Sequence, residues 1–367
     1  MHTTWVEVSL GALKHNLAQV RNLVGPSVRI MAVVKASAYG HGAVEASNAF
    51  IEAGADCLGV TTLEEGLELR AGGILAPALI FSPLLPDQFG DAVSHQLELT
   101  VCSLQMSEIL SKTAKKMKKT ARVHVKVDTG MHRLGMPGEL LENMSRLNDL
   151  PGIEIAGTYT HFANAGAKDL ADTQGQNEAF KRLADELNVQ DMSGGILHAA
   201  NSAAVLNLPD SWYDMVRPGT ILYGQYPTRF VDKKLDLRDT WQLKTRIVAL
   251  TNVPKGAKVG YGSEFTASRP TRAAVLPIGY ADGFTLLPQS LARRVHPLKA
   301  MAGSMIGKVI SPHVIIKGKQ ARVIGRISMQ MCSVDVTDIQ GIELGDEVIV
   351  PARRVSTSPR IPRVYVE

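Results

Sequence analysis

Short apolar runs alternate with longer segments of helical periodicity along the first two thirds of the chain. The runs are rich in β-branched residues and apolar at most positions, which is typical of strands buried on both faces of a sheet. Helical periodicity is clearest at 43–54 and 172–187. The eight predicted strands lie at 29–35, 56–60, 77–81, 97–101, 121–128, 153–161, 195–201 and 213–219.

This alternation predicts the α/β fold class, as a TIM-type (β/α)8 barrel. An open doubly wound sheet is the alternative, but the glycine-rich turn GxGxxG does not follow the first predicted strand. From about residue 240 the pattern changes to strand-like runs separated by turns, which indicates a mainly β domain. We therefore predict a barrel domain at 10–238 and a C-terminal β domain at 239–367, to which residues 1–9 can add a strand.

The charge, the cysteines and the hydrophobic runs indicate the kind of ligand, the absence of disulfide and metal sites, and the location of the protein. The chain has 367 residues and a net charge of +5, with scattered basic residues, which favours anionic small molecules over nucleic acid. The three cysteines are far apart and form no CxxC pair, so we expect neither a disulfide framework nor a metal site. The sequence starts without a signal-peptide core and contains no stretch of membrane-spanning length, so we expect a cytoplasmic protein without a membrane partner.

Polar side chains follow several predicted strands at their C-terminal ends, where the chemistry of such barrels is found. Lys35 ends the first strand, and His161 ends the sixth. Because all strands of a barrel run in one direction, we expect these side chains to converge on one mouth. The other candidates are Lys126, Asp128 and Arg133 after the fifth strand, His198, Asn201 and Ser202 after the seventh, and Arg217, Gly219 and Thr220 after the eighth.

The ends of the seventh and eighth strands predict a phosphate site, because this pair of loops commonly binds phosphate in barrels. Asn201 and Ser202 stand at the start of a helix, and Gly219 and Thr220 offer free backbone N–H groups. The alternative for Asn201 and Ser202 is ordinary N-capping of the helix.

Lys35 is the predicted reactive group. A lysine at a strand end is often a surface residue, but a lysine walled by barrel residues has a lowered amine pKa. Across from a phosphate site, such an amine suits a Schiff base with pyridoxal 5'-phosphate (PLP). Gly40 and Gly42 then permit a tight turn, and Tyr39 can point back toward the phosphate.

Several stretches match the motifs of one enzyme family, in that family's order. They are AVVKASAYGHGAV, HVKVDTGMHRLG, THFANA, ILHAANSAA, DMVRPGTILYG, VGYGSEFTA, LPIGYADGF and VIGRISM. Over nearly its whole length the chain thus resembles the alanine racemases. The resemblance implies a barrel with a C-terminal β domain, a PLP cofactor, and a homodimer whose active sites are shared between subunits. It also implies an isomerase that interconverts L-alanine and D-alanine and supplies D-alanine for peptidoglycan.

The resemblance also implies roles for individual residues. Lys35 and the partner subunit's Tyr261 correspond to two bases on opposite faces of the substrate. His161 corresponds to the hydrogen-bond partner of that tyrosine, and Arg217 to the arginine that faces the pyridine nitrogen. We further assign Tyr39, Asn201, Ser202, Gly219 and Thr220 to the cofactor, Arg133, Met329 and Tyr280 to the substrate, Arg326 to the entrance corridor, and Lys126 as a candidate for carbamylation.

Several of these residues also have a plain structural interpretation. His161 can be a core histidine, Tyr261 a half-buried strand tyrosine, and Lys126 an unmodified salt-bridge lysine. We assign His132 and His198 to structural roles. For the whole protein, the alternatives are a PLP decarboxylase of the same fold, which commonly has an acidic residue at the ring nitrogen, and a PLP-binding module without catalysis. Arg217 and Tyr261 argue against the first, and the β domain carrying VGYGSE argues against the second.

The sequence departs from the family pattern at three places. It lacks a stretch near INYE that supplies a phosphate-gripping tyrosine, so phosphate binding is weaker, another residue takes this place, or the sequence omits a segment. Residues 284–310 are longer than the family's link between LPIGYADGF and VIGRISM. Gln330 stands where Asp is common, and Ser328 where Cys is frequent. Alanine is therefore the first expected substrate, with serine or a larger amino acid left open.

Overall fold

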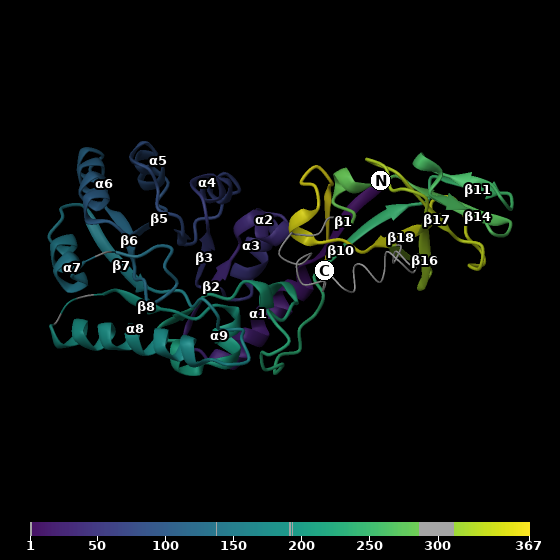
Figure 1. The fold of residues 1–367 in the computed structure, drawn as a ribbon. Coiled ribbons are helices and arrows are strands. Elements are labelled where there is room, and N and C mark those ends of the chain that lie inside the picture. Colours follow the sequence, from purple (N-terminus) through teal and green to yellow (C-terminus); the bar gives the residue numbers. More distant parts are fainter. Residues whose placement is uncertain (1, 137, 191, 193, 286–311) are drawn as a thin grey trace. The chain divides into compact units, whose positions relative to one another are not determined.

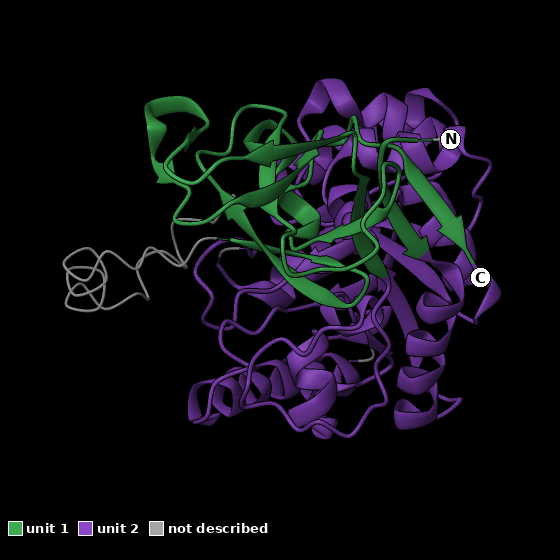
Figure 2. Cartoon of the chain, turned by 90° about the vertical axis from the view of Figure 1, so that its right-hand side faces the viewer, with its two compact units in different colours: residues 1–8, 241–366 green, residues 9–240, 367 purple. Residues whose placement is uncertain are grey.

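The computed structural model describes residues 2–136, 138–190, 192, 194–285 and 312–367. Within it the chain forms two compact units, which Figure 2 shows in different colours. The barrel unit comprises residues 9–240 and 367, and the β unit comprises residues 1–8 and 241–366. The surplus segment 284–310 lies almost entirely outside the described residues.

The centre of the barrel unit is a sheet of eight parallel strands in the order β8-β7-β6-β5-β4-β3-β2-β9 (Figure 1). A parallel bridge between Asn201 and Arg217 joins the segments after β8 and β9, which closes the sheet. The predicted TIM-type barrel is therefore confirmed, with six of the eight strands ending earlier than predicted and β3 and β5 ending where predicted. The strands are β2 (Arg29–Val33), β3 (Cys57–Val60), β4 (Ala78–Ile80), β5 (Glu98–Val101), β6 (Ala121–Lys126), β7 (Ile153–Tyr159), β8 (Ile196–His198) and β9 (Met215–Val216).

Helices connect these strands. Four of them begin at side chains that accept a hydrogen bond from the first turn, namely Ser9, Thr62, Ser103 and Asn201. The barrel unit contains α1 (Leu10–Val24), α2 (Lys35–Gly40), α3 (Ala43–Glu52), α4 (Leu63–Ala71), η1 (Pro86–Gln88), α5 (Phe89–Ser94), α6 (Leu104–Lys116), α7 (Leu140–Asn148), α8 (Ala171–Val189), α9 (Ser202–Asn207), η2 (Pro209–Ser211) and η3 (Thr220–Tyr223). No helix in the described part of the chain has the length and apolar character needed to cross a bilayer.

The segment α2 is a left-handed turn. Its residues 36–39 all have φ between 50° and 55°, although none of them is glycine. This conformation costs an L-residue roughly 1–2 kcal/mol, so the surrounding contacts must hold it. Glu65 Oε1 accepts the N–H of Ala36 at 2.6 Å, and His41 Nδ1 lies 2.8 Å from the carbonyl oxygen of Ala38. Gly40 and Gly42 have positive φ, as the predicted tight turn requires, but the turn begins four residues earlier than the first of them.

The β unit is a nine-stranded sheet in the order β11-β14-β17-β16-β15-β18-β10-β1-β19. The pairs from β11 through to β1 are antiparallel, and β1 at the start of the chain pairs with β10. Its elements are β1 (Thr4–Ser9), β10 (Trp241–Arg246), β11 (Ala249–Val253), β12 (Lys258–Val259), η4 (Tyr261–Ser263), β13 (Phe265–Thr266), β14 (Thr271–Leu276), η5 (Tyr280–Asp282), β15 (His313–Ile316), β16 (Lys319–Ile324), β17 (Cys332–Asp335), β18 (Glu347–Val350), η6 (Arg354–Ser356) and β19 (Arg363–Val366).

Candidate active site

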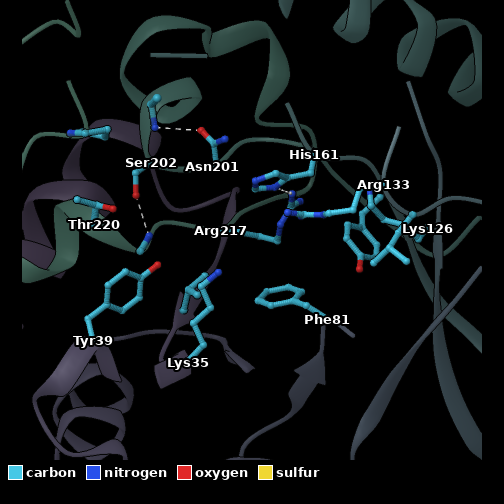
Figure 3. Close-up of a pocket in the computed structure, with 16 residues that line it drawn as sticks. Lys35, Tyr39, Phe81, Lys126, Arg133, His161, Asn201, Ser202, Arg217 and Thr220 are labelled. Carbon is cyan, nitrogen blue, oxygen red and sulfur yellow. Dashed lines mark hydrogen bonds between the residues drawn. The ribbon is translucent and has the colours of Figure 1, made fainter. Parts of the chain in front are cut away.

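A pocket of about 300 Å³ opens at the C-terminal ends of the barrel strands, where the sequence predicted the site (Figure 3). Its size is at the lower end of the range typical of small-molecule sites. Residues from widely separated parts of the sequence meet here. The predicted residues that line the pocket are Lys35, Tyr39, Lys126, Arg133, His161, Asn201, Ser202, Arg217, Gly219 and Thr220.

Lys35 follows the end of β2 and is held by the left-handed turn behind it. Figure 3 shows its side chain directed into the pocket, with Tyr39 on one side and Phe81 on the other. Although the residue as a whole is exposed, partial desolvation by the pocket walls lowers the pKa of its amine. The positive charge of Arg133 lowers it further, so the amine is a better nucleophile than an ordinary surface lysine.

The predicted phosphate corner differs from expectation in one respect. The N–H of Gly219 is not free, because it donates to Ser202 Oγ at 2.8 Å (Figure 3). The hydroxyl hydrogen of Ser202 can still be donated to a ligand. Thr220 is the first residue of η3, and N–H groups at the start of such a turn have no acceptor within it.

Asn201 has the capping role that the sequence analysis left as an alternative. Its side-chain oxygen accepts the N–H groups of Ala203 and Ala204, both at 3.1 Å, and so caps α9. Asn201 nevertheless lines the pocket, and its cap orients the start of α9 toward it. Anions are favoured at the N-terminal end of a helix segment because N–H groups point outward there.

Arg217 is buried at the base of the pocket and has only neutral acceptors around it. Its guanidinium donates to the carbonyl oxygen of Thr160 at 2.7 Å and to that of Ala199 at 3.0 Å. It also approaches two imidazoles, His198 Nδ1 at 2.8 Å and His161 Nδ1 at 3.4 Å. Burial lowers its pKa to about 10, which leaves it positively charged at neutral pH.

His161 and Lys126 both lie beside this cation. Burial, and then the charge of Arg217, lowers the pKa of His161 to about 3, so its imidazole is neutral. Burial, and then the charge of Arg217, also lowers the pKa of the Lys126 amine to about 7. The Lys126 amine donates to the carbonyl oxygen of Val127 and lies 4.9 Å from the centre of the Tyr159 ring. Among the described residues Lys126 forms no ion pair with a carboxylate, and the charge of Asp128 only partly offsets the lowering of its pKa.

The other predicted site residues belong to the β unit. Tyr261, Tyr280 and Met329 are exposed there by 73%, 45% and 58%. Arg326, also exposed, pairs with Glu264.

Two sequence profiles match this chain along most of its length. The model described as "Alanine racemase, N-terminal domain" matches residues 8–227, and "Alanine racemase, C-terminal domain" matches residues 240–363. The chain belongs to the alanine racemase family.

Named relatives and solved structures agree with this assignment. An alanine racemase of Desulforamulus reducens is 38% identical over 384 residues, with 99% of this chain and 98% of the relative covered. One of Methanococcus maripaludis is 38% identical over 352 residues, with 95% of this chain and 89% of the relative covered. The structure of the alanine racemase of Clostridium difficile 630 matches with a TM-score of 0.90 and 34% identity, covering 100% of this chain and 96% of that one. As a member of this family the chain is an isomerase.

Sequence reasoning missed part of the surroundings of this alanine racemase pocket. His198, assigned to a structural role, is hydrogen-bonded to Arg217. Tyr159 lines the pocket and stacks on His198, with ring centres 4.9 Å apart and an interplanar angle of 4°. Glu98 and His124 lie within predicted strands and were not selected as candidates, although a charged or titratable residue inside an apolar strand is a signal that could have revealed them. By contrast, His132 is exposed and lies 3.7 Å from the carboxylate of Asp128.

Proposed function

We propose that this chain interconverts L-alanine and D-alanine with PLP as cofactor. The observation that carries the proposal is the single pocket that joins a lysine amine of lowered pKa, a polar corner suited to a phosphate, and a buried arginine. Supporting it, the relatives from Desulforamulus reducens and Methanococcus maripaludis are named alanine racemase, and a solved relative from Bacillus anthracis is described with bound L-Ala-P. The product D-alanine would serve peptidoglycan synthesis.

The residues of the pocket fit PLP. Lys35 would form the covalent attachment to its aldehyde, and Tyr39, Ser202, Gly219 and Thr220, with Asn201 behind them, would hold its phosphate. The corner is tight, because a Cβ added at Gly219 would lie 2.5 Å from Tyr39 Oη. When bound, PLP supplies an electron-withdrawing ring that stabilises negative charge at the substrate Cα.

Arg217 favours racemisation over other PLP reactions. An arginine is effectively always protonated, so it cannot give its proton to the ring nitrogen. The ring then withdraws electrons less strongly than it would beside an acidic residue. By keeping its proton, Arg217 would limit how strongly the bound cofactor stabilises negative charge at the substrate Cα, and so would disfavour transamination. A decarboxylase with an acidic partner would use the opposite arrangement.

Racemisation needs a proton removed from one face of Cα and another returned on the opposite face. A single base would tend to restore the starting enantiomer, so we assign the two faces to Lys35 and to the partner subunit's Tyr261. A free tyrosine has a pKa of about 10, and nearby positive charge is needed to make it a base near neutrality. The neutral His161, next to the charged Arg217, would connect that tyrosine to such a charge.

The exposed residues of the β unit support a homodimer with shared sites. Tyr261, Tyr280 and Met329 would complete the pocket of the partner, while Arg133 would contact the substrate carboxylate. Ser328 and Gln330 flank Met329, and because they differ from the family pattern, serine or a larger amino acid stays a second candidate substrate.

One experiment tests reaction and substrate together. The protein, saturated with PLP, is incubated in heavy water with single L-amino acids, and the products are separated by chirality and mass. The proposal expects D-alanine with deuterium at Cα. Loss of carbon dioxide would identify a decarboxylase, and no exchange with any amino acid would identify a binding module.

Gly219→Ala tests the phosphate corner. The added methyl group would lie 2.5 Å from Tyr39 Oη, so the tyrosine must move away from the proposed phosphate position. We expect PLP affinity, measured by fluorescence titration, to fall about tenfold, the loss of one hydrogen bond to a charged group. Gly175→Ala is the matched control, because its Cβ on α8 would meet nothing within 4 Å. Unchanged affinity in Gly219→Ala would remove Tyr39 from the phosphate site.

Lys126 is expected to carry a carbamate. With a pKa of about 7 its amine is mostly neutral above pH 7, and the neutral nitrogen can attack carbon dioxide, form an N–C bond and release one proton. With ¹³C-bicarbonate, carbon NMR should show one protein carbamate signal that grows from pH 6 to pH 8. The signal should be lost in Lys126→Ala and retained in Lys181→Ala, which changes an exposed lysine of α8. A signal that survives in Lys126→Ala would assign the carbamate elsewhere.

A further inference from the structure

A line of buried polar side chains leads from Arg217 through the interior of the barrel. Arg217 lies 2.8 Å from His198 Nδ1, His198 Nε2 lies 2.9 Å from His124 Nδ1, and His124 Nε2 lies 3.0 Å from Glu98 Oε2. All four residues are at most 6% exposed. We call these four residues the buried relay. At its far end Glu98 Oε1 accepts from the half-exposed Arg122 at 2.9 Å.

The relay runs along the strands rather than around the mouth. Glu98 is the first residue of β5, and Arg122 is near the start of β6, whereas Arg217 follows the end of β9. The C-terminal ends of parallel barrel strands form the mouth, so the relay connects the pocket with the opposite end of the barrel. None of the proposed cofactor or substrate contacts reaches His124 or Glu98.

The direction of every hydrogen bond in the relay is determined by its first member. A guanidinium can only donate, so His198 Nδ1 must accept and its proton must be on Nε2. That N–H can then only donate to His124 Nδ1, which places the proton of His124 on Nε2 as well. His124 therefore donates to the Glu98 carboxylate. Both imidazoles are neutral, and all donors point toward Glu98.

Glu98 provides the negative charge that Arg217 lacks in its immediate surroundings. Burial alone would raise the pKa of Glu98, but the hydrogen bonds from His124 and Arg122, together with the charge of Arg122, outweigh burial and lower the pKa below its usual range. Glu98 is therefore ionised. The other acceptors of Arg217 are two carbonyl oxygens and the imidazole of His161, all of them neutral. A buried cation without a counter-charge is strongly disfavoured, so an ionised group two imidazoles away has a clear energetic role.

The barrel is shaped to hold His124 in this line. A Cβ added at Gly157 on β7 would lie 2.5 Å from His124 Nδ1, so the imidazole occupies space that any larger residue would take. The pairing of β6 with β7 shifts its register between Val123 and His124, which re-aims the histidine. On the other side, the ring of Tyr159 stacks on His198.

We propose that His124 and Glu98 are positioning residues for the racemase reaction, and that they orient and electrostatically balance Arg217 through His198. This proposal depends on the proposed function, because it concerns the side of Arg217 that would face the ring nitrogen. A carboxylate in direct contact would occupy donors of the guanidinium and cancel its field at that nitrogen. The two neutral imidazoles between them keep the charge of Arg217 available in the pocket and still fix its orientation.

The first test observes the relay without catalysis. Histidine labelled with ¹⁵N is incorporated into the full-length protein, and two-bond proton–nitrogen correlations distinguish protonated from unprotonated ring nitrogens. The relay requires the Nε2–H form at both His124 and His198, assigned by comparison with single substitutions of each. In Glu98→Gln the Nε2–H proton of His124 should move upfield, because the hydrogen bond to an anion is lost. A proton on Nδ1 of either histidine would overturn the proposal.

The second test uses kinetics with a matched control. Glu98→Gln removes the charge at nearly constant shape, whereas Glu154→Gln removes a half-exposed carboxylate that pairs with the same Arg122 at 2.6 Å but does not touch the relay. We expect kcat to fall about tenfold in both directions for Glu98→Gln with KM unchanged, and to stay within twofold for Glu154→Gln. Equal kcat values for wild type and Glu98→Gln would refute the positioning role.

The two tests separate failure of this proposal from failure of the proposed function. If the wild-type protein does not racemise any amino acid, the proposed function is wrong, while the histidine spectra still decide whether the relay exists. If Glu98→Gln does not fold, the spectra of the wild-type protein alone still decide it. A purely structural Glu98 would lower the melting temperature without changing kcat at temperatures where the variant is folded.

Discussion

Replacing Lys35 with arginine is expected to reduce racemisation by at least about a thousandfold. Arginine keeps the positive charge and most of the length, but it can neither attach an aldehyde nor lose a proton near neutrality. The variant thus loses the proposed covalent link and one of the two bases, each worth orders of magnitude in rate. The measurement is D-alanine formation, together with the mass of the chain after borohydride treatment in the presence of PLP.

The borohydride result makes this prediction specific to one position. Wild-type chains should gain the mass of one reduced cofactor, and Lys35→Arg chains should gain none. Lys181→Arg, an equivalent change on the exposed face of α8, should behave as wild type. Cofactor mass retained on the Lys35→Arg chain would mean that another lysine is the site of attachment.

Replacing Tyr261 with phenylalanine is expected to lower kcat for racemisation by about a thousandfold, the range associated with loss of a general acid or base. The variant should lose exchange of the α-hydrogen with solvent for only one of the two enantiomers. The variant should still exchange the α-hydrogen of one enantiomer with heavy water through Lys35, without inverting it, and should not exchange that of the other. Tyr213→Phe is the control, because its hydroxyl binds Asn177 at 2.9 Å in the barrel unit and does not line the pocket. Symmetric loss of exchange would contradict two separate bases.

Mixing the two inactive variants tests whether Tyr261 acts in the partner's site. In a hybrid dimer of Lys35→Arg and Tyr261→Phe chains, one shared site carries both defects and the other is intact. Random reassociation after mild dissociation should restore roughly one quarter of wild-type activity, because about half of the dimers are hybrids with one good site each. If Tyr261 served its own chain, no intact site would form and activity would not return.

The strand pattern and the strand ends were sufficient to predict the barrel and the place of its pocket. Lys35, His161 and Arg217 were recognisable because a polar residue at the end of an apolar strand has few other reasons to be there. The left-handed turn was not predictable in the same way. Local sequence rules reserve that conformation for glycine, whereas here non-glycine residues adopt it and are held by Glu65, which comes from a different strand–helix unit.

Hydrogen-bond partners were the least predictable feature. The Gly219 N–H was expected to be free, but it is taken by Ser202, which is 17 positions earlier in the chain. The relay likewise joins β5, β6 and β8, so no local window contains more than one of its members. Its only sequence trace is a charged residue within LELTV and a histidine within VHV, where the strand pattern alone would call for apolar side chains.

In the left-handed turn α2, replacing alanine with glycine should have the opposite effect on folding stability from the one it has in an ordinary helix. In an ordinary helix glycine is about 0.5–1 kcal/mol worse than alanine, because the unfolded chain gains freedom. Ala36 is exposed and has a left-handed backbone, which costs an L-residue roughly 1–2 kcal/mol. Replacing it with glycine would remove this steric cost, and that gain exceeds the entropic cost of glycine. Glycine there would make the folded protein more stable and, at the same time, loosen the backbone directly beneath Lys35. Alanine at position 36 therefore restricts the backbone next to Lys35 and lowers the stability of the folded state relative to glycine.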